Sequence, residues 1–242
     1  MRVRSRPEHP VTGAALAVVG GFLDAYTYVA HGGVFANAQT GNVVLVAMDA
    51  AQGRWAQAAA YLPVIGAFLL GLVAAETLAA HRPVLGDPTR VVLLVEIAVL
   101  VAVAGLSPAT PQLVTTTAVA FVAALQVSTF RLVRDTSYST TMTTGNLRSL
   151  VTATYEWLSG YDRSQRVVAL RLALIVLAFA SGAGLGAVAS APDALGTRAT
   201  LLAAAVLAGV LVAIETHSRR TASPDEAAGP APVPALVGAA DD

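Results

Sequence analysis

Six long apolar segments occupy most of this 242-residue chain. They are residues 11–31, 56–79, 91–107, 112–133, 167–190 and 199–216. An α-helix needs about 20 apolar residues to cross the roughly 30 Å hydrocarbon core of a bilayer. Backbone groups in lipid have to be hydrogen-bonded internally, and these segments lack the alternation of a membrane strand. The sequence therefore predicts an all-α polytopic membrane protein with six long transmembrane helices.

The composition supports this class and excludes others. The chain is 55% hydrophobic and only 12% charged, with a mean hydropathy of +0.65, whereas a soluble domain carries about 25% charged residues. The 15 basic residues, all of them Arg, balance 15 acidic ones, so no basic surface for nucleic acid is expected. Cysteine is absent, which excludes disulfides and thiolate metal sites.

Two shorter segments begin with the same tripeptide. Thr40-Gly41-Asn42 opens residues 40–51, and Thr144-Gly145-Asn146 opens residues 144–158. At about 1.5 Å of rise per residue, neither segment comfortably spans a bilayer. Each tripeptide follows a long span and precedes two more, which predicts two repeats of the same order. The expected boundaries are a cytoplasmic segment 1–10, a first repeat 11–108, a second repeat 109–218 and a disordered cytoplasmic tail 219–242.

The arginines indicate that the short segments do not cross. If they are re-entrant or broken helices and the N-terminus is cytoplasmic, 12 arginines lie inside and 2 lie outside. If both cross, the division is 8 against 6. The positive-inside rule favours the first arrangement, with both termini cytoplasmic. Each half then has three spans, so the halves insert with opposite topology. Inverted repeats with broken helices are a known plan of transporters.

The tripeptide residues have a physical rationale as site residues. A Thr hydroxyl can cap a helix start, Gly permits close approach, and Asn offers both donors and acceptors. Two helix N-termini aimed at one point suit an anion or a polar ligand. We therefore expect a midplane site near the two tripeptides. The alternative is that these residues only cap and pack the short helices. The candidate substrate-binding residues are Asp24, Gln39, Thr40, Gly41, Asn42, Gln126, Thr144, Gly145 and Asn146.

Asp24 and Gln126 are polar residues within two long spans. A carboxylate in a span is costly and usually faces a cavity or a partner, so Asp24 is expected to bind a cation, relay a proton or contact substrate, or else to be a hydrogen-bonded structural Asp. The 104-residue shift between the tripeptides aligns Asp24 with Ser128. Glu76 and Glu96 are expected to pair with nearby arginines, Arg82 and Arg90, at the cytoplasmic boundary.

The stretch GFLDAYTYVAHGGVFANAQTGNVV, residues 21–44, and the later MTTGNL, residues 142–147, resemble the YoaK-like family of bacterial integral membrane proteins, long described as a domain of unknown function. The resemblance covers about residues 11–216. It implies a multi-pass protein of the bacterial cytoplasmic (inner) membrane and assigns no substrate or residue roles.

Topology and polar placement favour a small secondary transporter or permease for a small polar or anionic solute. The alternative is a non-catalytic membrane scaffold or regulatory partner subunit. No catalytic or metal-ligand motif appears, so neither enzymatic activity nor a cofactor or metal is expected. The expected partners are the lipid bilayer, the unknown solute and, as an open alternative, further copies of the chain.

Overall fold

A computed structural model describes residues 9–81, 87–107, 109–133, 136–141, 143–191 and 193–221. The protein is all-helical, with 80% helix and eight α-helices in the described residues. The helices are α1 (Pro10–Ala30), α2 (Gln39–Ala51), α3 (Trp55–Ala80), α5 (Pro88–Ala104), α6 (Gln112–Thr129), α7 (Thr143–Leu158), α8 (Gln165–Ala189) and α9 (Thr200–Thr221), with a 3-10 turn, η1 (Gly196–Ala199), before the last.

Five segments are long and apolar enough to cross a membrane, as expected of a multi-pass membrane protein. They are α1, α3, α6, α8 and the stretch Gly196–His217. Helix α5 is also apolar but has only 17 residues, near the lower end of the length that spans a bilayer. The sixth span therefore stays a prediction. The N-terminal segment and most of the C-terminal tail lie outside the described residues.

The predicted segments match the helices closely except at the end of the last, where α9 runs five residues beyond 216 to Thr221, and at the end of the fourth. Helix α6 stops at Thr129, four residues before the predicted end. Strands β1 (Leu132–Val133) and β2 (Thr136–Ser137) then form a short antiparallel hairpin, with Leu132 opposite Ser137. The backbone N–H of Tyr138 donates to Arg131 O and closes this turn. An apolar run this short does not distinguish strand from helix, which is why the sequence extended the helix.

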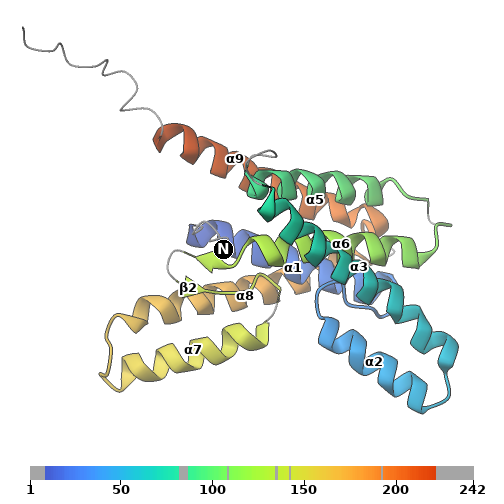
Figure 1. Ribbon diagram of the computed structural model, residues 1–242, viewed down its shortest axis with the longest axis horizontal. Coiled ribbons are helices and arrows are strands. Elements are labelled where there is room, and N and C mark those ends of the chain that lie inside the picture. The colour runs from blue at the N-terminus through green and yellow to red at the C-terminus, as the bar shows by residue number, and fades with distance from the viewer. Residues whose placement is uncertain are drawn as a thin grey trace, which may run out of the picture.

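The helices pack in a pattern centred on α1 (Figure 1). Helix α1 packs along α8, and α3 packs along α6. Each short helix lies on the long helix that follows it, α2 on α3 and α7 on α8. Helices α5 and α9 pack on each other, α5 also on α6, and α9 also on α1.

Small residues allow the closest helix approach. A Cβ added to Gly21 would overlap the backbone of α8 at Phe179, and one added to Gly182 would overlap the backbone of α1 at Val18. Gly71 makes the same kind of approach from α3 to Phe121 of α6. Such contacts are typical of membrane helices, where close packing replaces hydrophobic burial as the force between helices.

Candidate functional site

The loop after α1 folds back along the helix. The backbone N–H of Asn37 donates to Asp24 Oδ1 at 2.7 Å, and Asn37 Nδ2 donates to Gly20 O at 3.0 Å. Gly20 precedes the end of α1, Ala30, by ten residues, which is about 15 Å along a helix axis. Helix α2 therefore starts beside the middle of α1 rather than at its end.

The loop before α7 reaches the same point. A Cβ added to Gly20 would lie 2.6 Å from Thr140 O and 3.1 Å from Thr141 Cγ2. Gly20 is the central residue of α1. The two loops, distant in sequence, thus meet at the middle of one helix, and α2 and α7 extend away from that region in different directions (Figure 1). We call this meeting point the Gly20 junction, formed by Gly20, Asp24, Asn37, Thr140 and Thr141.

The two tripeptide asparagines make equivalent contacts. Asn42 Oδ1 accepts the backbone N–H of Phe35 at 3.0 Å, and its Nδ2 donates to Phe35 O at 2.7 Å. Asn146 bonds Ser139 in the same way, at 3.0 Å and 2.7 Å. Each Asn is buried and holds the backbone of the residue seven positions earlier. We call this arrangement the Asn clasp. It uses the Asn side chain to fix the loop, as in the structural alternative.

The Thr and Gly residues of the two tripeptides do not lie where the sequence predicted. Helix α2 begins at Gln39, one residue before Thr40, and its N-cap, Ala38, has no capping side chain. The prediction that Thr40 caps this helix is therefore wrong, because the helix starts earlier. Helix α7 likewise begins at Thr143, ahead of Thr144. Thr40, Thr144 and Gly145 are exposed on the surface of the chain, and Gly41 is half-buried under the Phe35 ring.

Asp24 takes the position near the start of α2 that a capping side chain would occupy. Its carboxyl accepts the backbone N–H of Asn37, two residues before the helix begins. A carboxylate at this end is favoured by the partial positive charge of the helix N-terminus. Gln39 completes the turn, since its Nε2 donates to Ala36 O at 2.9 Å and its Oε1 accepts from Asn42.

Gln126 joins the same face of α1 from α6. Its Nε2 donates to Leu16 O at 3.1 Å, one helical turn before Gly20, while its Oε1 has no hydrogen-bond partner in the described part of the chain. Asn37 Oδ1 and the hydroxyls of Thr140 and Thr141 share that condition. All four side chains are at most 4% exposed. Gln126 thus contacts α1 one turn from Gly20, and Asp24 contacts the first loop one turn beyond Gly20. The predicted Thr and Gly residues are not part of this cluster.

The sequence prediction missed Asn37, Thr140 and Thr141. A signal for two of them was present, because the 104-residue shift that aligns the tripeptides also aligns Asn37 with Thr141. Both residues contact Gly20. Thr140 has no such signal, since the shift aligns it with Ala36.

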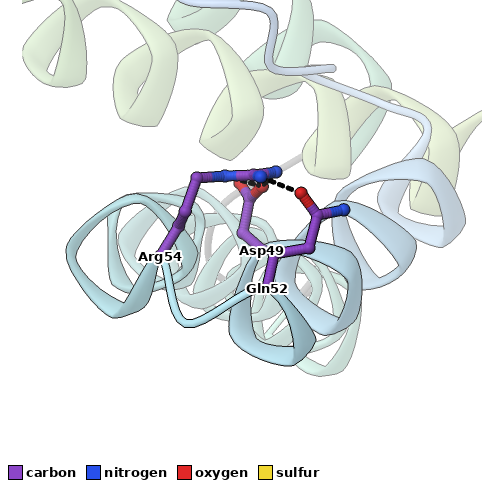
Figure 2. Close-up of polar contacts among 3 residues, drawn as sticks. All are labelled: Asp49, Gln52 and Arg54. Atoms are coloured by element: carbon purple, nitrogen blue, oxygen red, sulfur yellow. Dashed lines mark hydrogen bonds and ion pairs between the residues drawn. The ribbon is translucent and has the colours of Figure 1, made fainter.

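The remaining charged residues serve mainly at the periphery. Asp49 pairs with Arg54 in the turn between α2 and α3, and Arg54 also donates to Gln52, as Figure 2 shows. Arg131 pairs with Glu76 at 3.3 Å, and Arg90 with Glu215 at 3.2 Å.

Glu96 is the exception among these acidic residues. It is completely buried on α5, and neither carboxyl oxygen has a partner in the described residues. The predicted pairing with Arg90 is wrong, because Arg90 lies two turns earlier on α5 and pairs with α9 instead. Arg82, the other expected partner, lies outside the described residues.

In the stretches that the structure describes, no group of three or more His, Cys, Asp or Glu residues is placed to hold a metal ion. The family described as "Protein of unknown function (DUF1275)" matches residues 12–213. No curated protein and no solved structure matches the chain significantly. The match covers every residue of the Gly20 junction. The chain therefore belongs to the DUF1275 family.

Proposed function

We propose that this protein is a small secondary transporter or permease for a small polar solute. The observation that carries the proposal is the Gly20 junction, where two fold-back loops bring buried polar side chains to the middle of a membrane-length helix. Broken helices that meet at the midplane are the usual setting of a transport site. An anionic solute, the other expectation, has less support, because Asp24 already faces the start of α2 and the free atoms at the junction are mostly oxygens.

We further propose that the halves form an inverted repeat with six spans, including α5. Helix packing supports it. Exchanging α1–α5 for α6–α9 converts the α1–α8 contact into the α6–α3 contact, α2–α3 into α7–α8, and α5–α6 into α9–α1. A two-fold relation between the halves requires this exchange. The two Asn clasps, 104 residues apart, fit the same relation.

In this arrangement α2 and α7 enter the membrane from opposite sides, and both termini are cytoplasmic. We place the protein in the bacterial inner membrane, with the YoaK-like proteins, as a non-enzyme that needs no cofactor, and homo-oligomerisation stays an alternative. A membrane scaffold or regulatory partner remains the second candidate function. It is favoured by the Asn clasps, which show that the tripeptide asparagines already have a structural role.

Topology is tested by single cysteines, since the chain has none of its own. Gln52 lies in the exposed turn between α2 and α3, and Tyr161 is 91% exposed in the turn between α7 and α8. In intact cells, a membrane-impermeant thiol reagent should label Gln52→Cys but not Tyr161→Cys. Permeabilised cells should label both. Labelling of Tyr161→Cys from outside, with Gln52→Cys protected, would reverse the topology.

Transport is tested at the junction itself. A water-accessible path predicts that Thr141→Cys reacts with an impermeant reagent from at least one side of the membrane in proteoliposomes. The matched control is Val92→Cys, which is equally buried but lies in the apolar core cluster. The control should stay unreactive. If both cysteines resist the reagent from both sides, the scaffold is the better account.

A further inference from the structure

Among the unpartnered polar atoms at the Gly20 junction and on neighbouring Gln126, hydrogen-bond acceptors outnumber donors. The amide orientations are fixed by chemistry, since the carbonyls of Leu16 and Gly20 can only accept hydrogen bonds. The NH₂ groups of Gln126 and Asn37 must therefore face α1, as they do at 3.1 Å and 3.0 Å. Their amide oxygens are consequently the free atoms, and both are buried without a partner in the described residues.

Two hydroxyls and a backbone carbonyl add to this set. Thr140 Oγ1 and Thr141 Oγ1 are buried without partners in the described part of the protein, although their residues lie against Gly20. Thr140 O faces the same helix. A buried polar atom without a partner costs free energy. Three such oxygens belong to residues that contact Gly20, and the fourth belongs to Gln126, which contacts Leu16 one turn earlier on α1. A ligand in this region would supply the missing interactions.

The charge at the junction selects the sign of that ligand. Asp24 is 6% exposed, and none of the ion pairs formed by the described residues includes it. Among the described residues, its carboxyl is bonded by backbone and side-chain amides of the first loop. Carboxylate, amide and hydroxyl oxygens are the ligands of hard cations. An anion would add like charge to Asp24.

The size and charge of the ligand follow from the same residues. The backbone of Thr140 lies so close to Gly20 that a single Cβ would be 2.6 Å from its carbonyl oxygen. This close packing suits a small ligand such as a bare ion. Divalent sites usually combine several carboxylates, whereas the junction has only Asp24 among its five described members. A single negative charge with neutral oxygens suits a monovalent ion.

We infer that Asp24, Asn37, Gln126, Thr140 and Thr141 form a binding site for Na⁺ at the Gly20 junction. The four unpartnered side-chain oxygens coordinate the ion, and Asp24 balances its charge. The bound ion links α1 and α6 to both fold-back loops, so its binding stabilises the folded state. Its role as a coupling ion rests on the proposed transport function, but the binding itself does not.

Thermal unfolding of the full-length protein in detergent tests the site. At constant ionic strength, replacing choline chloride with NaCl should raise the melting temperature in a saturable manner, because a ligand that binds only the folded state stabilises it. Thr140→Val combined with Thr141→Val removes two free oxygens and keeps the side-chain shape. This variant should need at least about tenfold more Na⁺ for the same stabilisation.

Two controls separate the ion site from general effects. Thr152→Val changes an exposed hydroxyl on α7 that bonds its own helix, and Glu96→Gln neutralises a buried carboxyl away from the junction. Both should keep the wild-type Na⁺ response. Equal stabilisation by choline and Na⁺, or no response to either, would overturn the inference and leave water as the occupant. A wild-type response in the double valine variant would also overturn it.

A direct measurement covers the case in which the double variant does not fold. Equilibrium dialysis of wild-type protein with radioactive Na⁺ should give saturable binding that excess unlabelled NaCl removes and choline chloride does not. Non-saturable binding would overturn the site. If wild-type protein binds Na⁺ but the Thr141→Cys variant does not react with the reagent from either side, the ion site is supported and the transporter is overturned. Reagent access without any Na⁺ response would do the reverse.

Discussion

The two fold-back units share their backbone geometry and differ in the residues that surround it. In each unit an Asn clasp holds the residue seven positions earlier, Phe35 in the first and Ser139 in the second. The helix before the first unit contributes buried Asp24. The equivalent residue before the second unit is Ser128, which accepts a hydrogen bond from Arg131 in an exposed network with Glu76.

The two units therefore share the shape that the Asn clasps give them and differ in the chemistry of the residues at positions 24 and 128. Asp24 gives the Gly20 junction one carboxylate among its described residues, whereas Ser128 lies outside the junction in the network with Arg131 and Glu76. The equivalence of the two halves can be tested first at the helix contacts that hold them together.

The largest effect is expected at the α1–α8 contact. A Cβ at Gly182 overlaps the backbone of Val18, which cannot move as a flexible side chain would, so the helices must separate. We expect Gly182→Ala to lower the free energy of unfolding by about 3 kcal/mol or more. The control is Gly184→Ala two residues later, where a Cβ meets nothing within 4 Å. Thermal unfolding in detergent measures both.

The contact between α3 and α6 is the counterpart of the α1–α8 contact and can be tested in the same way. Gly71→Ala should behave like Gly182→Ala, because its Cβ overlaps the backbone of Phe121, while Gly66→Ala has open space and should be tolerated. Equal melting temperatures for Gly182→Ala and Gly184→Ala would contradict the close approach. If Gly71→Ala were tolerated, the close helix approach would be limited to the α1–α8 contact.

The Asn clasps are expected to be next in size. Asn42→Ala leaves the N–H and the C=O of Phe35 unpaired, which should cost about 2–4 kcal/mol. Asn146→Ala removes the same two bonds from Ser139 and should cost somewhat less, because among the described residues Asn146 has no counterpart of the bond that Asn42 makes to Gln39 Oε1 at 2.9 Å. Chemical unfolding in mild detergent compares the two variants.

Gln39→Ala is the matched control for this difference. It removes the extra bond together with the bond that Gln39 Nε2 donates to Ala36 O, so its cost sets an upper limit on the contribution of the extra bond. The equivalence of the clasps would be wrong if Asn146→Ala were harmless while Asn42→Ala unfolded the protein.

The sequence predicted the helices well because their signal is local. Segment 40–51 became Gln39–Ala51 and segment 144–158 became Thr143–Leu158, since apolar runs and polar breaks are visible without a partner. The fold-back of the loops was not predictable in this way. It depends on Asn37 finding Gly20, a contact between residues that are 17 positions apart.

Side-chain roles were the least predictable. A polar Asn in a membrane sequence can face a ligand or its own backbone, and composition is the same in both cases. Asn42 faces its backbone, whereas Asn37, five residues earlier, leaves its oxygen free. The predicted Glu96–Arg90 pair was wrong for a similar reason, since proximity in sequence did not decide that Arg90 faces α9 and pairs with Glu215.

A smaller effect should separate the two tripeptide glycines. A Cβ at Gly41 would lie 2.9 Å from Phe35 Cδ2, whereas one at Gly145 meets nothing within 4 Å. The Phe35 ring can shift, so Gly41→Ala should cost about 1 kcal/mol. Gly145→Ala should be neutral or slightly stabilising, since Ala favours helix. If Gly145→Ala lowered the melting temperature, a contact at Gly145 would exist that the described structure does not contain.

The smallest effect concerns the two outer turns. The turn after α2 is closed by the Asp49–Arg54 pair (Figure 2), and the turn after α7 by Asp162, which accepts from Ser164 N at 2.8 Å. Hydrogen bonds from the Ser164 side chain and backbone hold the pKa of the Asp162 carboxyl below its usual range. A carboxyl whose pKa is lowered by folding stabilises the protein above its unfolded pKa, about 3.9. That contribution is lost as pH falls through the folded value.

The melting temperature of wild type minus that of Asp162→Asn should therefore be positive at neutral pH and shrink toward zero below about pH 3.9. Since the carboxyl is fully exposed, solvent weakens its bonds and the difference should be small. Ser164→Ala, which removes the hydroxyl but keeps the backbone N–H, should show part of the same loss. A difference that grows as pH falls would have the wrong sign and would show that Asp162 does not close the second turn as Arg54 closes the first.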